Sequence, residues 1–268
     1  MRASDIRSFD PMRYGAYICL NVPPASKAAT ADADVPALAD RLGLGNEYGA
    51  AGGDPPQSIA YLRTVSAVPG QLDDPGLVGA QAVVHVAATA PEPVTEFRAG
   101  LARLLGPAVT QRVLSGVVRP PGYTGQAMFN FSYGERVLQQ PAAVMPNAFL
   151  VPLSKTADWW RKDWMERHTY FLPRYDGAGT MRNQGHALAA AQGIACLLRR
   201  TYKALTEPAA EGDFDFITYF ECADAEVPVF HDVCGALRDV TRNPEWAFVR
   251  EGPTWHGRRT ATWRELFG

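Results

Sequence analysis

The chain has 268 residues, enough to bury a large core in one domain or in two similar halves. Apolar residues make up 47% and charged residues 20% of the sequence, which is ordinary for a soluble globular protein. The formal net charge is −2 and no basic stripe is present, so nothing predicts a nucleic-acid partner, although a locally positive cleft for a small anion stays open.

The N-terminal sequence and the cysteines predict the cellular compartment of the protein. Residues 1–10 contain no apolar signal core, and no stretch of the chain approaches the length of a membrane span. The four cysteines show no C-x-x-C spacing and each lies in an apolar run: Cys19, Cys196, Cys222 and Cys234. We expect buried free thiols in a reducing compartment, hence a cytoplasmic protein without a membrane partner.

Strand and helix patterns alternate along the first half of the chain. Residues 14–22, 58–68, 80–88 and about 112–119 read as strands, and helical spacing of apolar residues predicts a helix over 91–105. Residues 25–57 are rich in Ala, Asp, Gly and Pro, which predicts either a long loop or a short helix with a loop.

The second half repeats this order. A strand is predicted at 147–153, followed by an interrupted helical region over 159–195 for which Asp158 is the expected N-cap. The interruption is expected around 173–179. Further strands are predicted at about 196–204, 214–222 and 246–251, with a helix over 227–240 between the last two.

Similar patterns recur at a near-constant offset in the two halves. Ala16-Tyr-Ile-Cys corresponds to Ala148-Phe-Leu-Val, and Ala82-Val-Val-His corresponds to Phe216-Ile-Thr-Tyr. We therefore predict an α+β fold with two ferredoxin-like repeats, over residues 12–135 and 145–262. Two such sheets can protect their edges by packing together or by closing into a barrel, as a dimeric α+β barrel does.

His186 and Arg199 precede the strand that carries Thr218 and Phe220 on one face. A single imidazole and an always-charged guanidinium, with few other polar groups, are what a haem that uses a small anion would need. An isolated histidine is more often an ordinary helix residue. No phosphate-binding loop, zinc-type cluster or Gly-x-Ser-x-Gly elbow is present, so kinases, zinc enzymes and serine hydrolases have little support.

Two runs carry a family resemblance: Pro152-Leu-Ser-Lys-Thr-Ala-Asp-Trp-Trp160 and Asp213-Phe-Asp-Phe-Ile-Thr-Tyr-Phe-Glu221. With them the chain resembles the chlorite dismutase family, most nearly its longer-chain, usually pentameric branch. The likeness covers about residues 14–22 and 78–258 and is strongest over 147–238. That family also has two ferredoxin-like repeats per chain, which agrees with the repeat found above, and it binds haem b.

The resemblance implies a role for each matching residue. His186 matches the proximal iron ligand, and the spacing from it to Arg199 is the family's spacing. Arg199 matches the distal arginine, which distinguishes chlorite-degrading members from coproheme decarboxylases, although the adjacent Arg200 leaves the register open by one residue. The remaining matches lie at the distal wall (Thr218 and Phe220), at the haem propionates (Tyr123 and Lys155), and at a tryptophan pair near the haem and the interface (Trp159 and Trp160).

The chain departs from the family at three places. Extra residues lie between Trp160 and His186, over 161–185, and a smaller insertion lies around 206–212. The glutamate that should accept a hydrogen bond from the proximal histidine is also out of register. Glu245 could replace it if the loop shifts by two or three residues; otherwise the imidazole lacks an anionic partner.

We therefore predict a haem b enzyme that converts the small anion chlorite to chloride and dioxygen. We expect it to be a homo-oligomer, with a pentamer favoured. Arg199 is its expected catalytic residue. Other haem chemistry on the same scaffold is the alternative: coproheme decarboxylation, or a peroxidase-like or nitrogen-oxide reaction. A third possibility, from a different class, is a barrel that binds haem without turnover or binds none at all.

Overall fold

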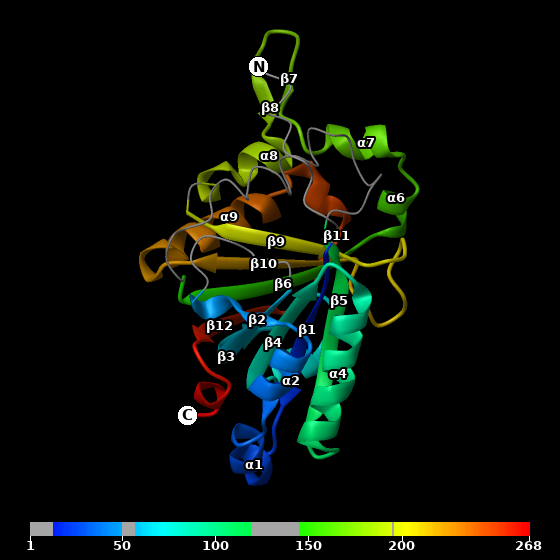
Figure 1. The fold of residues 1–268 in the computed structure, drawn as a ribbon. Coiled ribbons are helices and arrows are strands. Elements are labelled where there is room, and N and C mark those ends of the chain that lie inside the picture. Colours follow the sequence, from blue (N-terminus) through cyan, green and yellow to red (C-terminus); the bar gives the residue numbers. More distant parts are fainter. Residues whose placement is uncertain (1–12, 50–56, 119–144, 195) are drawn as a thin grey trace, which may run out of the picture.

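The computed structural model describes residues 13–49, 57–118, 145–194 and 196–268. Figure 1 shows a β-barrel with helices packed on its outside, and a narrow hairpin that projects from the end opposite to α1. Within the described residues, none of the helices is both long and apolar enough to cross a membrane.

The first half of the chain forms one ferredoxin-like repeat, with its four long strands arranged in the order β5-β1-β4-β3. Its elements are β1 (Arg13–Asn21), α1 (Lys27–Ala31), α2 (Val35–Arg41), β2 (Gly45–Asn46), β3 (Ser58–Val68), α3 (Pro75–Val78), β4 (Ala82–Ala88), α4 (Pro91–Leu105) and β5 (Thr110–Val118).

The second half repeats the arrangement, in the order β9-β10-β6-β12. Its elements are β6 (Asn147–Lys155), α6 (Ala157–Trp160), α7 (Trp164–Thr169), β7 (Arg174–Tyr175), β8 (Met181–Asn183), α8 (Gly185–Ala189), β9 (Leu198–Lys203), β10 (Phe216–Cys222), α9 (Val227–Arg238), β11 (Val249–Glu251) and β12 (Thr254–Thr260).

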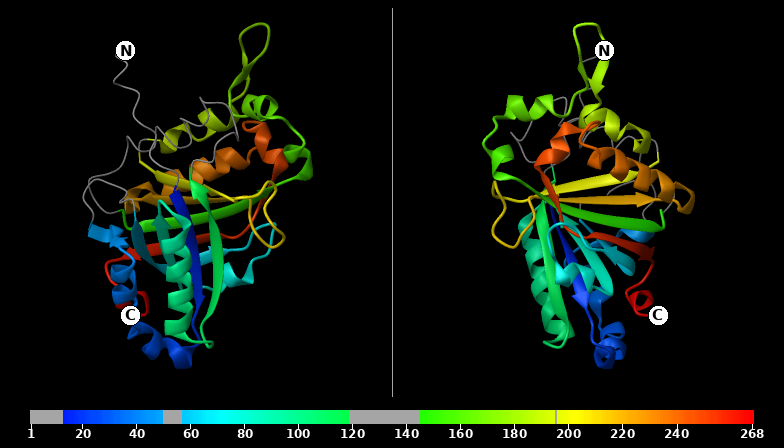
Figure 2. Two further views of the ribbon diagram at one scale, coloured as in Figure 1. Left: turned by 45° about the vertical axis from the view of Figure 1, so that its right-hand side comes forward. Right: turned by 180° about the vertical axis from the view of Figure 1, so that it is seen from behind.

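The two sheets join edge to edge into a closed barrel. β5 pairs with β9 on one side, β3 pairs with β12 on the other, and all these pairings are antiparallel. Eight strands of the described residues form the barrel, which leaves none of these eight with an open edge. The two further views in Figure 2 show the helices on the outer side of this wall. The predicted α+β fold with two repeats is confirmed.

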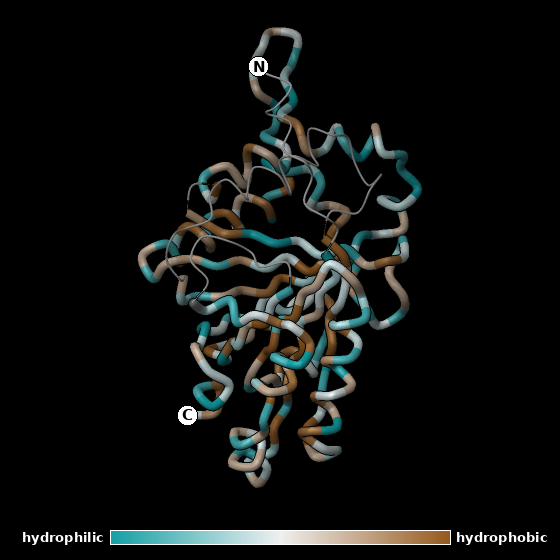
Figure 3. The backbone as a smooth tube through the Cα atoms, in the orientation of Figure 1, coloured by the Kyte–Doolittle hydropathy of each residue, from teal (hydrophilic) through white to brown (hydrophobic). Residues whose placement is uncertain are grey.

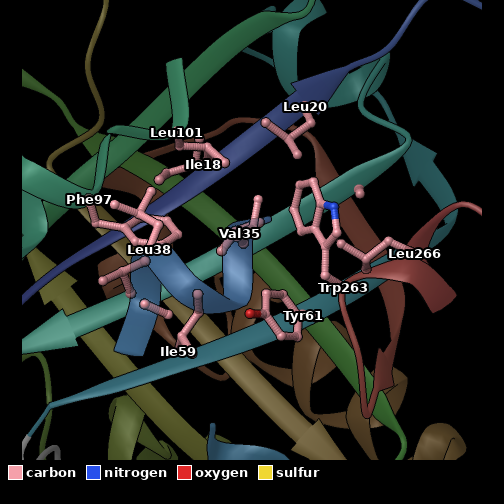
Figure 4. Close-up of a cluster of buried hydrophobic side chains, with 14 of the residues drawn as sticks. Ile18, Leu20, Val35, Leu38, Ile59, Tyr61, Phe97, Leu101, Trp263 and Leu266 are labelled. Carbon is pink, nitrogen blue, oxygen red and sulfur yellow. The ribbon is translucent and has the colours of Figure 1, made fainter. Parts of the chain in front are cut away.

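Both faces of the central strands β1 and β4 are buried, for different reasons. In β1, Ile18 and Leu20 pack outwards against helices, whereas Tyr17 and Cys19 point into the lumen. The strands therefore read as near-continuous apolar runs, seen as brown segments in Figure 3. The outer core of the first repeat is drawn in Figure 4, where Trp263 from the end of the chain packs among residues of α2 and β3.

Helix α4 has the bounds that its apolar spacing predicts. Val94, Phe97 and Leu101 are buried on one face, and Pro91 occupies the first turn, where its missing N–H costs nothing. The helix ends at Gly106, whose φ of 69° is a left-handed conformation that glycine adopts readily.

Several sequence-based details need correction. Asp158 does not cap a helix: α6 begins at Ala157, and the capping carboxylate is that of Asp163, which accepts from the Glu166 N–H at the start of α7. The predicted interruption of the helical region holds the hairpin of β7 and β8. Within 25–57 the described residues form short helices, which favours the second of the two expectations.

The last strand of the second repeat lies later than predicted. Half of the region 246–251 belongs to a 3-10 turn, Pro244–Phe248, and the other half is the short β11. The barrel is closed instead by β12, which the pattern of the sequence did not reveal. The match of Ala16 to Ala148 is also out of step by one residue, because Ala16 faces the helices whereas Ala148 faces the lumen.

The predicted division into residues 12–135 and 145–262 stays a prediction. Residue 12 and residues 119–135 lie outside the described part of the chain. The described C-terminal tail after 262 packs into the core of the first repeat, through Trp263, Leu266 and Phe267. The two halves are therefore interlocked in their packing.

Two leucines on α4 test this description of the core. Leu101 is fully buried whereas Leu104 is 44% exposed. Replacing Leu101 with alanine should lower the free energy of unfolding by about 2–5 kcal/mol, because it removes buried methyl groups and leaves a cavity. The control Leu104→Ala should change it by less than about 0.5 kcal/mol. Urea unfolding of both variants measures the difference, and equal losses would contradict the assigned helix face.

Candidate functional site

The outer face of the second repeat's sheet is covered by helices and carries both apolar and polar side chains. The strands β6, β10 and β9 lie side by side there, and α8 and α9 pack over them (Figures 1 and 2). Phe149 and Phe220 of the sheet form one cluster with Phe230 of α9 and with Ala189 and Ala190 at the end of α8. Figure 3 shows a hydrophilic stretch along β9 beneath these helices.

Three polar side chains on this face are only half-buried. Thr218 is the one residue of β10 that is not fully buried, and Arg199 and Thr201 have the same status in β9. The strand register places them together, since Thr218 lies opposite Thr201 and Phe220 lies opposite Arg199. The helices thus leave a patch of the sheet with a guanidinium and two hydroxyls incompletely covered, beside the buried ring of Phe220.

Strand alternation separates Arg199 from Arg200. Arg199 shares the outer face with Thr201, whereas Arg200 points into the lumen and donates to the Glu47 carboxylate at 2.9 Å. Arg200 is 4% exposed and is consumed by this internal pair. Of the two adjacent arginines, Arg199 is therefore the one on the face of the candidate site.

His186 lies on α8 over the same layer. It stands three and four residues before Ala189 and Ala190, which pack towards Phe220, so helical geometry turns all three to the same side. Its Nδ1 lies 2.8 Å from Oε2 of Glu245, in the 3-10 turn after α9. Because the carboxylate accepts from Nδ1–H, the lone pair of this imidazole is on Nε2.

Glu245 joins His186 to Lys155. Its other oxygen accepts from the Lys155 ammonium at the end of β6, and both of these side chains are almost completely buried. Burial alone would raise the pKa of Glu245, but the charges of Lys155 and His186 hold this pKa at about 2. Burial lowers the pKa of Lys155, although Glu245 and then Asp215 oppose that shift. The carboxylate is thus held as an anion between two cationic or proton-donating partners.

Lys155 and Trp159 form part of the same arrangement. The Lys155 ammonium lies 4.3 Å from the ring centroid of Trp159, which is fully buried. The resemblance places Lys155 beside a haem propionate, whereas in the structure its ammonium contacts Glu245 and this ring. Lys155 is therefore a partner of Glu245, the carboxylate that also contacts His186, and the sequence did not suggest this role.

Trp160 is held by a buried carboxylate that the sequence did not single out. Asp215 accepts from the Trp160 Nε1–H at 3.2 Å, from the Lys155 backbone N–H at 2.6 Å and from the Ala209 N–H at 2.7 Å. The Trp160 ring stacks on Phe216 of β10. Asp215 thereby ties the insertion around 206–212 to the end of β6.

The remaining site residue, Tyr123, lies outside the described residues. The 161–185 insertion contains α7 and the hairpin of β7 and β8. Its Phe171 forms a T-shaped ring contact with His186, with centroids 5.6 Å apart. Glu245 was named from the sequence only on condition of a loop shift, and the 3-10 turn provides that geometry.

The site thus belongs to a two-repeat barrel protein, with His186 in the helical layer over the second sheet and Arg199 on that sheet. No family model matches the sequence, and no curated protein matches it either. Solved structures do. A tryptophan-to-phenylalanine variant of the chlorite dismutase from Candidatus Nitrospira defluvii, in complex with cyanide, has a TM-score of 0.65 and 21% identity, over 95% of this chain and 93% of that one.

An arginine-to-alanine variant of the same enzyme has a TM-score of 0.64, with 21% identity and the same coverage. A further chlorite dismutase-like protein has a TM-score of 0.61 at 12% identity, over 96% of this chain and 98% of that one. This chain therefore has the chlorite dismutase fold, over nearly its whole length.

The Glu245 pair predicts a specific acid sensitivity. The pKa of Glu245 is about 2 in the folded protein and about 4.3 in an unfolded chain, so the folded form binds fewer protons in between. The stabilisation is fully present above the unfolded pKa and is lost as the pH falls towards 2.

Urea unfolding at pH 5 and pH 3 measures this loss. Glu245→Gln should show a smaller decrease in stability between these two pH values than the unmodified protein does. The exposed control Glu96→Gln, with the same change in charge, should retain the full decrease. An undiminished pH dependence in Glu245→Gln would contradict the ion pair.

Proposed function

We propose that this protein is a haem b enzyme that converts chlorite to chloride and dioxygen. The single observation that carries the proposal is that His186 lies in the helical layer and Arg199 lies on the sheet that this layer covers. His186 is on the helix over the sheet and is backed by Glu245, and Arg199 is on the sheet itself. The chlorite dismutase fold is consistent with this activity, and at 12–21% identity it supports the scaffold alone.

The donor set fits a haem. An axial ligand needs a neutral imidazole with one free lone pair, and the Glu245 contact with Nδ1 leaves Nε2 of His186 for iron. The imidazole side chain is 18% exposed, so it is not sealed by its neighbours. Phe171, Phe220 and Trp159 offer aromatic surface in the same layer, and Thr218 with Thr201 leaves the sheet incompletely covered.

The residues around His186 would tune the ligand. Because Glu245 is held anionic, it draws the Nδ1 proton and raises the electron density that Nε2 can donate. Lys155 limits this effect by sharing the carboxylate charge. Glu245 and Lys155 together keep the His186 imidazole in one tautomer and one ring orientation.

Arg199 would bind and hold the anion. Its guanidinium remains charged at all relevant pH values, so it attracts chlorite without itself exchanging a proton. The haem, when bound, would supply the redox chemistry that joins the two oxygens of chlorite as dioxygen and releases chloride. Arg199 would keep the chlorine-containing fragment next to this centre until the oxygen–oxygen bond is complete, which is a task of positioning and electrostatics.

The first test is haem loading followed by chlorite addition. We expect the full-length protein to bind haem b with a Soret band and to release oxygen from chlorite. Haem binding without oxygen release would remove the chlorite activity and favour other haem chemistry on this scaffold. Failure to bind haem even after reconstitution would remove the haem proposal altogether.

Arginine variants test the catalytic role. Arg199→Ala should retain haem but lower the turnover number by about 10²–10³-fold, because a preorganised charge is lost from the site. Arg161→Ala, which removes an exposed guanidinium on the 161–185 insertion, is the matched control and should keep full turnover. Equal rates in both variants would show that Arg199 is not the anion-holding residue.

His186→Ala tests the iron ligand. This variant should lose the Soret band of bound haem, and added imidazole should restore it in part by filling the vacated position. His168→Ala is the control, since this histidine lies on α7 within the insertion. Retention of a normal Soret band in His186→Ala, with its loss in His168→Ala, would reverse the assignment.

A further inference from the structure

The lumen of the barrel contains a buried polar and aromatic cluster that the proposed reaction does not use. Strand alternation directs Arg200 and Tyr202 of β9 into the lumen, opposite to Arg199. They meet Tyr17 of β1, His85 of β4 and Tyr219 of β10. All five residues are at most 4% exposed, and they come from both repeats.

The centre of this cluster is a hydrogen bond between Tyr202 and His85. The Tyr202 hydroxyl lies 2.9 Å from His85 Nε2. The space for the phenol comes from Gly15, where an added Cβ would lie 2.3 Å from Tyr202 Cε1 and 2.7 Å from its oxygen. The pair is therefore a sterically defined contact between the two repeats.

The surroundings determine which way the hydrogen bond runs. His85 Nδ1 lies 3.6 Å from Oε1 of Glu47, close enough for an electrostatic contact but too far for a hydrogen bond. The Glu47 carboxylate accepts from Ser58 and from Arg200. Burial opposes ionisation of Glu47, but Arg200, His85 and Ser58 hold its pKa well below the usual range, so it is an anion. A carboxylate beside Nδ1 favours the tautomer with its proton there, so Nε2 accepts from the Tyr202 hydroxyl.

His85 is a neutral base at physiological pH. Its burial lowers the pKa of the imidazole, and Glu47 only partly opposes this shift. Burial also raises the pKa values of Tyr17 and Tyr219 well above the normal value, so these phenols do not ionise. Within the cluster, Tyr202 thus has what a phenol needs to lose a hydrogen-bonded proton: an adjacent, unprotonated imidazole with a carboxylate behind it.

Packing alone does not require such a group. Charges taken out of water are costly, and apolar residues of similar volume commonly give equal or better stability. The lumen nevertheless buries Glu47 with Arg200 and, beyond Tyr219, Glu221 with Arg259. Tyr17 stacks on His85 with centroids 4.6 Å apart, and the two remaining tyrosines lie within 6 Å of Tyr17. A continuous aromatic group surrounds the Tyr202 pair.

We propose that Tyr202 is a redox-active tyrosine, with His85 as its proton acceptor, that takes up oxidising equivalents escaping from the haem site. The inference rests on the proposed function, because the oxidised haem is the one-electron oxidant. In the step, one electron leaves Tyr202 and reduces the oxidised haem by one equivalent. The Tyr202 O–H bond breaks, and its proton forms a new N–H bond on His85 Nε2. A neutral tyrosyl radical and an imidazolium beside Glu47 result.

This step would protect the haem pocket. Trp159, which packs on Phe171 beside His186, would be modified if it held the oxidising equivalent instead. The proton on His85 stays within hydrogen-bond reach of the radical oxygen, so the return of one electron regenerates the starting pair. Tyr202 is not placed in the anion-binding machinery, and the initial rate does not depend on it.

The test is electron paramagnetic resonance of the haem-loaded full chain, freeze-quenched after mixing with hydrogen peroxide. A Soret band is recorded first. We expect a tyrosyl signal that narrows when ring-deuterated tyrosine is incorporated. Tyr202→Phe should lose this signal, because the ring stays but the oxidisable O–H is gone. The matched control Tyr17→Phe, in the same cluster and equally buried, should retain it.

Haem survival gives a second readout. During chlorite or peroxide turnover, Tyr202→Phe should lose its Soret absorbance several-fold faster than the unmodified protein, at an unchanged initial rate. A signal of full intensity in Tyr202→Phe, or no tyrosyl signal in protein with a normal Soret band, would overturn the inference while the proposed function stands. Absence of a Soret band would remove the proposed function and this inference together.

Discussion

Two assignments depend on the alternation of side chains along β9: Arg199 belongs to the outer candidate site, and Arg200 with Tyr202 belongs to the lumen. A strand presents successive residues to opposite faces, so the adjacent residues Arg199 and Arg200 must serve different environments. One faces the helices α8 and α9, and the other faces a closed lumen. A slip of one residue would exchange them, placing Arg199 beside Glu47 and leaving Arg200 on the outer face. Register is fixed because β9 pairs on both sides, with β10 and with β5.

The buried carboxylate of Glu245 is the second constraint. An isolated anion at this depth would be strongly disfavoured, and Lys155 together with His186 compensates for the loss of hydration. The arrangement links three elements that are far apart in the chain, since β6, α8 and the turn after α9 each contribute one residue. Removing any one of the three leaves a buried group without its partner, so the triad is at once a structural junction and a means of orienting the imidazole.

Much of the scaffold was accessible from the sequence because its signals are local. The limits of α4 follow from apolar spacing with Pro91 at one end and Gly106 at the other, and the strand runs follow from their continuous apolar character. β12 escaped because its sequence, Thr254-Trp-His-Gly-Arg-Arg-Thr260, carries charge on both faces: Arg258 pairs outside with Asp224 and Arg259 pairs in the lumen with Glu221. Tertiary pairing, which no local pattern encodes, makes it a strand.

Less of the candidate site could be predicted from the sequence, because more of it depends on tertiary contacts. The spacing from His186 to Arg199 and the two aromatic runs lie in continuous sequence. The contacts of Glu245 and Asp215 depend on how a turn and a loop fold back, and a shift of two or three residues would change them. The contact of Lys155 with Glu245 likewise joins residues 90 positions apart. Long-range contacts of this kind are specified by the fold as a whole.

The two repeats also explain why the candidate site lies on the second sheet. In the first repeat, α2 and α4 cover the corresponding outer face, and the tail residues Trp263, Leu266 and Phe267 fill what remains (Figure 4). The equivalent of Thr218 on β4 is Val84, which is fully buried in that core. In the second repeat, α8 is short and the patch around Arg199 stays half-buried. The C-terminal tail thus closes one face of the pseudo-symmetric barrel and leaves the other available for chemistry.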